Sequence, residues 1–242
     1  VFERIGKVSV SEYKSILSAN EQFSYRNKME FSFGSSRWLS QEEIQTGIDI
    51  ENKDFAFGLY IAGRYDKILD IHNCEIQSNY ANDILNEIRR YLIINKLNAY
   101  NTRTYEGFLR SFIIRRSLYN DDYMTILIAQ TAKLSKEKEF IEWYKTEFAN
   151  NFDKISNIVY AVNNSNNPVN ISDTHILKGT GYLTEDILGV KYRISPFSFF
   201  QTNSFMLNSF ISLIIENAEI SSDMIVWDLY CGTGSITLPA AK

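Results

Sequence analysis

The chain has 242 residues, 45% of them hydrophobic and 14% aromatic. A disordered protein buries too little apolar surface to offset its chain entropy, so this composition excludes one. No apolar run approaches the roughly 20 residues that cross a bilayer, so we expect no membrane segment. The sequence opens without a secretory signal pattern, and its 2 cysteines make no disulfide framework. We therefore expect a cytoplasmic protein, and we expect a monomer.

The net charge argues against nucleic-acid binding over the whole surface. Twenty-five basic residues stand against 29 acidic ones, which gives a formal charge of −4. A protein that binds nucleic acid broadly is usually basic. Any RNA-binding surface on this chain must therefore concentrate positive charge locally.

The first part of the chain predicts an α+β domain with an antiparallel sheet. Residues 9–20 are expected to form a short helix. In 25–33 polar and apolar residues alternate, with Met29 and Phe31 on one face and Arg26 and Lys28 on the other, which is typical of a half-buried strand. The other expected elements are strands at 54–61 and 67–71, a helix at 78–97, strands at 111–118 and 123–130 joined by a hairpin turn, and a helix at 135–150.

The pattern changes near residue 195. A helix with apolar periodicity is expected at 204–217, and the apolar run 224–229 is typical of a strand buried on both faces of a parallel sheet. Such a strand needs neighbours, which crossover connections supply. We therefore expect 224–242 to be the first βα unit of a larger domain, and the chain to be an internal part of a longer polypeptide.

The turn after this run has the spacing Asp228-x-x-x-Gly232-x-Gly234. Glycines at a strand-to-helix turn let a ligand approach the backbone, and the acid can accept hydrogen bonds. A dinucleotide fingerprint would place a third glycine where Thr237 stands, so the shorter turn suits S-adenosylmethionine better. An ordinary glycine-rich turn is the alternative.

Five strings of the sequence carry a family resemblance. In chain order they are YRNKMEFSFG (25–34), GRYDKILDIHNC (63–74), GFLRSFIIRR (107–116), GYLTEDILGVKYRISPFSFFQTN (181–203) and DLYCGTGSITLPAA (228–241). Together they resemble the RNA uracil-5-methyltransferase family, across almost the whole chain. The resemblance implies transfer of a methyl group from S-adenosylmethionine to C5 of a uridine in RNA, and we expect 23S rRNA as the substrate.

The resemblance also divides the chain. It implies a central, RNA-facing α/β domain over 1–194. Residues 195–242 would then begin a Rossmann-like class I methyltransferase domain, truncated after its first βα unit.

The resemblance implies a role for each matching residue of the cofactor site. Gln201 is expected to reach the cofactor and target base, and Tyr230 to pack on S-adenosylmethionine. Asp228, Gly232 and Gly234 would form the rest of that site.

Among the aromatic residues of the same motif, Phe199 is expected to line the pocket for an extruded base. Core packing is the alternative role for Phe197, Phe199 and Phe200, and we expect it to hold for at least one of them.

Basic residues on two strands are the expected RNA contacts. Arg26 and Lys28 share the polar face of one strand and could reach neighbouring phosphates. Residues 101–118 hold four arginines, including Arg110, against the single acid Glu106. We predict RNA contacts at Arg26, Lys28 and Arg110.

The cysteines receive separate interpretations. The resemblance makes Cys74 a candidate fourth ligand of a [4Fe–4S] cluster in the longer protein, and a buried free thiol is the alternative. In the family a cysteine thiolate attacks C6 of uracil, C5 takes the methyl group and a carboxylate base removes the C5 proton. Cys231 lies inside the cofactor turn, so we assign it a structural role. We expect no catalytic residue in this chain, and no activity from it alone.

Two other functions remain open from the sequence. One is a class I methyltransferase with a non-RNA acceptor, and the other is a non-catalytic RNA-binding module. RNA binding that depends on Arg26 and Lys28 would separate the first from our interpretation, and a nucleophile motif in the rest of the protein would separate the second.

Overall fold

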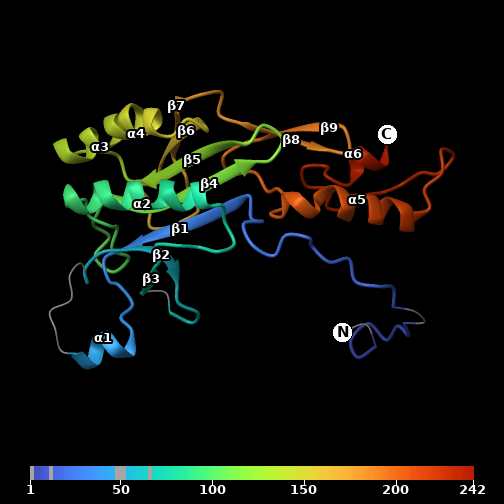
Figure 1. The fold of residues 1–242 in the computed structure, drawn as a ribbon, viewed down its shortest axis with the longest axis horizontal. Helices are drawn as coiled ribbons and strands as arrows, with labels where there is room; N and C mark the ends of the chain where they lie inside the picture. The colour runs from blue at the N-terminus through green and yellow to red at the C-terminus, as the bar shows by residue number, and fades with distance from the viewer. Residues whose placement is uncertain (1–2, 11–12, 47–52, 65–66) are drawn as a thin grey trace.

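A seven-stranded sheet is the centre of the molecule (Figure 1). The computed structural model describes residues 3–10, 13–46, 53–64 and 67–242. The strands of the sheet are β1 (Lys28–Gly34), β2 (Ala56–Tyr60), β3 (Ile68–Asp70), β4 (Leu109–Ser117), β5 (Asp122–Ala129), β6 (Ile155–Val162) and β7 (Asp173–Lys178). Their order is β3-β2-β1-β4-β5-β6-β7. Every neighbouring pair is antiparallel except β5 and β6, so the expected antiparallel sheet is a mixed one.

Helices cover one face of this sheet, as Figure 1 shows. The expected helix at 78–97 is α2 (Asn79–Ile94), and the Ser78 hydroxyl caps it by accepting from the Ala81 N–H at 3.2 Å. The expected helix at 135–150 forms as two, α3 (Ser135–Lys145) and α4 (Glu147–Asn151), because the backbone leaves helical geometry at Thr146. A short helix, α1 (Gln41–Thr46), follows β1.

Aromatic side chains fill the core between the sheet and these helices. Phe57 of β2 meets both Phe31 and Phe112 edge-on, with ring centroids 6.0 Å apart in each pair. On the helical side Tyr91 stacks on Trp143 at 4.0 Å. Such pairs contribute beyond the apolar area that they bury, so they add to the stability of this side of the sheet.

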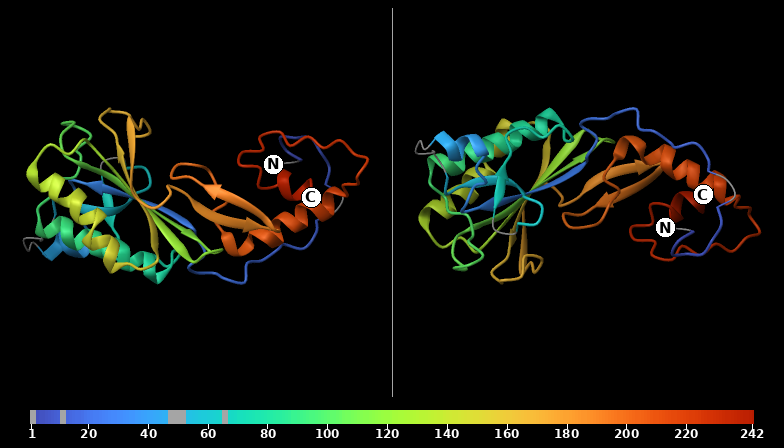
Figure 2. Two further views of the ribbon diagram at one scale, coloured as in Figure 1. Left: turned by 90° about the horizontal axis from the view of Figure 1, so that it is seen from above. Right: turned by 90° about the horizontal axis from the view of Figure 1, so that it is seen from below.

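A second core lies on the opposite face of the sheet. There the hairpin of β8 (Leu183–Ile187) and β9 (Val190–Ile194) packs with α5 (Ser204–Ala218) against β4, β5 and β6. Leu188 and Gly189 both have positive φ, 50° and 79°, as a two-residue hairpin turn requires. Figure 2 shows hairpin and helix extending from one end of the sheet. The division at residue 194 stays a prediction, and this core contains residues from both sides of it.

Two expected elements are not formed. In 9–20 the described residues make no helix, and Ile16 is 93% exposed, so that segment has no apolar surface to pack against. No strand forms over 224–229 either, because no neighbouring strand is hydrogen-bonded to it in the described chain. Only the four-residue helix α6 (Thr237–Ala240) follows. None of the described helices is long and apolar enough to span a membrane.

Candidate functional site

The strand motif at 26–28 and the motif at 201–204 meet in space. Asn27 is 8% exposed, and its side-chain amide donates to the Gln201 carbonyl oxygen at 2.7 Å and to the Ser204 hydroxyl at 2.6 Å. Its backbone N–H donates to the Thr202 carbonyl at 2.9 Å. Residues that are 174 positions apart thus form one junction. We call Asn27 with 201–204 the motif junction.

Arg115 of β4 holds the beginning of the same motif. Its guanidinium is buried and donates to the backbone carbonyls of Ser195, Pro196 and Ser198, the last at 2.6 Å. Burial lowers the pKa of Arg115 to about 10, which still leaves it charged at neutral pH. In the described part of the chain no carboxylate pairs with it. A buried charge that donates to three carbonyls and to the Ser198 hydroxyl fixes the path of that loop.

The aromatic residues of this motif divide between core and surface. Phe200 is 4% exposed and packs in the second core beside Tyr192, with ring centroids 6.0 Å apart. Phe199 is 69% exposed and Phe197 is 42% exposed. Core packing is therefore confirmed for Phe200, whereas Phe199 presents its ring to the outside, where a base could contact it.

The turn at 228–235 has the backbone expected of a ligand-binding loop. Gly232 and Gly234 have φ of 56° and 73°, and Tyr230 has φ of 73° with a fully exposed side chain. A Cβ at Gly232 would meet only the Tyr230 carbonyl oxygen, at 3.9 Å, so this side of the turn is open. The Asp228 carboxylate accepts from the Thr237 hydroxyl at 2.5 Å and faces a hollow of about 810 Å³ beside α5. An acceptor next to an open glycine turn fits the ribose hydroxyls and amino group of S-adenosylmethionine.

One contact ties this turn to the second core. The Tyr192 hydroxyl of β9 donates to the Gly234 carbonyl at 3.1 Å. Gln201 does not line the hollow at Asp228; its backbone is engaged with Asn27 instead. The structure therefore brings Gln201 together with the 26–28 strand, and the cofactor roles of Gln201, Tyr230 and Asp228 stay predictions.

The expected RNA contacts differ in their surroundings. Arg26 pairs with Asn203 in a backbone bridge, and Lys28 is half-buried opposite Arg115 on β4. Burial, and next the charge of Arg115, lowers the pKa of Lys28. Both basic residues thus flank the motif junction. Arg110 lies elsewhere, with its guanidinium 3.8 Å from the centre of the Tyr100 ring.

Two other arginines of 101–118 are engaged within the protein, so they offer RNA less positive charge than the sequence indicated. Arg115 is buried on carbonyls, and Arg116 pairs with Asp121 at 2.9 Å. The residues that hold the 195–204 segment and that the sequence did not single out are Asn27 and Arg115. Asn27 stands at an apolar position of the alternation in 25–33, and that interruption was the available signal for it; β4 does not alternate, so its sequence carries no such signal for Arg115.

Cys74 lies in the turn before α2, partly buried against the main core. Its backbone N–H donates to the Asn82 side chain at 3.0 Å. The described residues contain no group of three or more His, Cys, Asp or Glu that could hold a metal. A [4Fe–4S] cluster usually takes four thiolates, and this chain has 2 cysteines, so its own residues do not fit that cluster.

Known proteins match the chain over nearly its full length. An uncharacterized RNA methyltransferase of Bacteroides thetaiotaomicron is 34% identical over 234 residues, which are 96% of this chain and 51% of that protein. A second, from Chlorobaculum tepidum, is 31% identical over 243 residues, 99% of this chain and 49% of that protein. The chain is thus similar in sequence to proteins named RNA methyltransferases. It spans about half the length of these relatives, and no family model matches it.

A solved structure shares the fold. The tRNA (uracil-54, C5)-methyltransferase of Pyrococcus abyssi, in complex with S-adenosyl-L-homocysteine, matches with a TM-score of 0.65 at 20% identity. The match covers 92% of this chain and 47% of that one. The mixed sheet with its hairpin and long helix is therefore an arrangement found in an RNA methyltransferase.

Proposed function

We propose that the protein transfers a methyl group from S-adenosylmethionine to C5 of a uridine in RNA. The motif junction carries the proposal, because the buried Asn27 amide joins YRNKMEFSF (25–33) to SPFSFFQTN (195–203), two of the three strings that are most specific to the resemblance. The curated relatives named RNA methyltransferases support the same activity class.

S-adenosylmethionine supplies a methyl group on a sulfonium, which an electron-rich carbon can take. C5 of uracil gains that methyl group and loses a proton, and S-adenosylhomocysteine leaves. In this chain, Asp228 would accept hydrogen bonds from the cofactor, while Gly232 and Gly234 admit it to the backbone. Gln201 and Phe199 would contact the base, which must leave its stack to expose C5 and C6.

Arg115 and Asn27 act on this site as positioning residues. Arg115 fixes 195–198 and Asn27 fixes 201–204, so together they hold the two ends of the segment that carries Phe199 and Gln201. Lys28 and Arg26 beside the junction would meet the phosphates that flank the extruded uridine.

The experiment incubates the full-length protein with RNA and labelled S-adenosylmethionine. Nucleoside analysis of the RNA then identifies the methylated product. We expect 5-methyluridine in 23S rRNA, and a parallel reaction on tRNA tests that choice of RNA. A methylated protein or small molecule in place of RNA would favour the non-RNA acceptor. RNA binding without any methyl transfer would favour a non-catalytic module.

The 242 residues alone are expected to bind but not to methylate RNA. The 2 cysteines are Cys74, partly buried beside the main core, and Cys231, inside the glycine turn, and we assign the nucleophile to neither of them. Measurable 5-methyluridine from this chain would contradict the assignment of the nucleophile to another part of the protein.

A further inference from the structure

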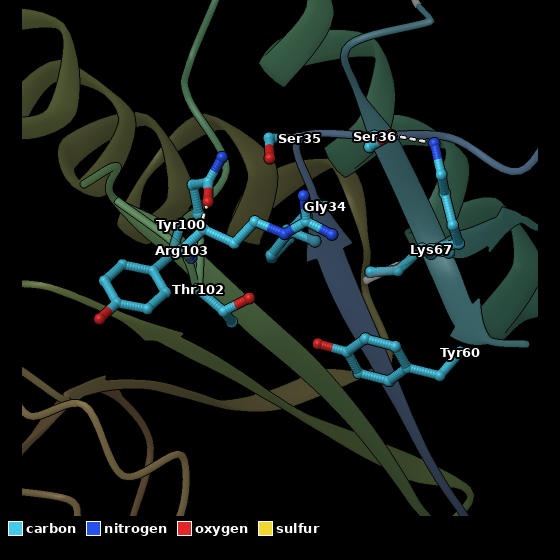
Figure 3. A pocket seen from close by; sticks show the side chains of 11 residues that line it. Gly34, Ser35, Ser36, Tyr60, Lys67, Tyr100, Thr102 and Arg103 are labelled. Carbon is cyan, nitrogen blue, oxygen red and sulfur yellow. Dashed lines mark hydrogen bonds between the residues drawn. The ribbon is translucent and has the colours of Figure 1, made fainter. Parts of the chain in front are cut away.

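A hollow at the far end of β1 lies outside the site described above. Its lining includes Tyr60 of β2, Lys67, and Arg103 from the loop before β4 (Figure 3). A second hollow of about 800 Å³ adjoins it and shares Tyr60 and Tyr100 in its lining. We call the two together the sheet-end pocket. Because β1 runs from Lys28 to Gly34, about 20 Å separate the first hollow from the motif junction, and the second hollow extends along β1 as far as Glu30.

Positive charge gathers at the sheet-end pocket although the chain is acidic. Lys67 and Arg103 line the first hollow, and Arg64 and Arg110 line the second. Among the described residues of both linings, Glu30 is the one carboxylate. The whole chain carries −4, so this excess of cations runs against its overall charge. Local concentration of this kind is what an RNA-binding surface on this chain requires.

The polar groups of the first hollow are arranged for an anion. The Lys67 ammonium donates to the Ser36 hydroxyl at 2.5 Å, which holds its long side chain against the end of β1. Figure 3 shows Arg103 reaching into the hollow from the opposite segment. Hydroxyl, ammonium and guanidinium donors together match the oxygen atoms of a phosphate diester.

Aromatic rings complete the sheet-end pocket. Tyr60 is 51% exposed on β2, and its hydroxyl points into the hollow (Figure 3). Tyr100 is 7% exposed, and the Arg110 guanidinium covers its ring at 3.8 Å. The exposed Tyr60 ring and the planar Arg110 guanidinium both line the second hollow, and an unstacked base can lie on such planar groups.

We propose that the sheet-end pocket binds a single-stranded segment of the RNA substrate, with phosphates on Lys67 and Arg103 and a base on Tyr60. The proposal rests on the proposed function, since it assumes an RNA substrate, and it adds a second anchoring point away from the target uridine. Contact there would select RNAs in which unpaired nucleotides lie at a fixed distance from that uridine.

The test measures binding of a labelled single-stranded oligouridylate to the full-length protein by fluorescence anisotropy, over a range of salt concentrations. Tyr60→Ala should weaken binding about tenfold, through lost stacking, with the salt dependence unchanged. Lys67→Ala with Arg103→Ala should reduce the slope of log K against log salt by about 1.4, which corresponds to two phosphate contacts. The matched control is Lys133→Ala with Lys138→Ala, two exposed lysines at the helical layer.

Several outcomes would overturn the proposal. One is that every pocket variant binds with the same affinity and the same salt slope as the control pair, while the wild type still forms 5-methyluridine. In that case the sheet-end pocket does not bind RNA, and the proposed function is unaffected. Equal weakening by Tyr60→Ala for single strand and duplex would remove the base-stacking role. Tight binding of polyglutamate, lost in the same variants, would indicate an acidic protein partner instead. A wild type that neither binds nor methylates RNA would contradict the proposed function itself.

Discussion

Single buried polar residues hold the candidate site in place. Arg115 lies on β4, and Asn27 directly precedes the neighbouring strand β1. Both donate to backbone carbonyls of the segment 195–204. Removing such a donor leaves buried carbonyls unpaired, and each unpaired group costs more than an ordinary hydrogen bond contributes. Their effect on the site is therefore larger than their number of contacts indicates.

Arg115→Gln should lower the free energy of unfolding by about 3 kcal/mol, because a shorter neutral amide cannot reach three carbonyls. Arg90→Gln is the control, since Arg90 is an exposed arginine that pairs with Glu87 on α2. Urea unfolding measures both. Equal unfolding midpoints for the two variants would show that the Arg115 contacts contribute nothing to the fold.

Glu185 of β8 gives the fold a pH dependence. Burial raises the pKa of its carboxyl to about 7, although the Leu118 N–H donates to it at 2.7 Å. The unfolded chain, with a pKa near 4.5, releases this proton first. Between these values the folded state binds more protons than the unfolded one, so stability falls as pH rises from about 4.5 to 7.

Glu185→Gln should remove the loss of stability above pH 4.5, because glutamine carries no proton to release. We expect the free energy of unfolding of the variant to exceed that of the wild type by about 1 to 3 kcal/mol at pH 8 and to match it near pH 4. Glu216→Gln, at an exposed position of α5, should change neither value. If Glu185→Gln raised the free energy of unfolding as much at pH 4 as at pH 8, the charge of Glu185 would not be the cause of the pH dependence.

At the scale of elements, a residue of the motif junction caps the N-terminus of α5. The Asn203 side chain accepts from the Met206 N–H at 3.2 Å and caps the helix. Asn203→Ala should lower the free energy of unfolding by about 1 kcal/mol. Asn203→Asp should keep most of the stabilisation, because aspartate also caps helices. Asn217→Ala, in the last turn of the same helix, is the comparison and should cost less. An equal cost at both ends would mean that the cap is not what stabilises α5.

The sequence predicted the elements in which polar and apolar side chains alternate regularly, with the period of a strand or of a helix. Alternation in 25–33 located β1, and helical spacing located α2 and α5. Strand β6 was missed although Ile158–Val162 is a continuous apolar run, because such runs have no period to distinguish them. The same ambiguity made 224–229 look like a strand, since a buried strand exists only beside its neighbours.

The site was predictable in part for a related reason. Gln201 and the glycine turn stand out as motifs, so the sequence located them. The junction through Asn27 depends on a contact between residues 174 positions apart, and the spacing of residues along one chain does not encode such a contact.

At the scale of the whole molecule, a rigid sheet carries an exposed apolar segment. Trp227 is 80% exposed and Ile225 is 88% exposed, whereas Phe112 and Leu127 of the sheet are fully buried. Limited chymotrypsin digestion of the 242-residue chain should therefore cut within 224–230 before it cuts within 109–129. Mass spectrometry identifies the products. A first cut inside β4 or β5 would contradict the stability that we assign to the sheet.

The motif junction is the central claim, and Asn27→Asp tests it most directly. That change keeps the size of the side chain but turns a donor toward the Gln201 carbonyl into a charged acceptor, which repels it. Asn86→Asp is the matched control, because Asn86 also donates to a carbonyl, that of His72, on the helical side of the sheet. The measurement is kcat/KM for 5-methyluridine formation by the full-length protein. We expect Asn27→Asp to lose at least about tenfold while Asn86→Asp stays near wild type; wild-type kcat/KM in a folded Asn27→Asp protein would contradict the account.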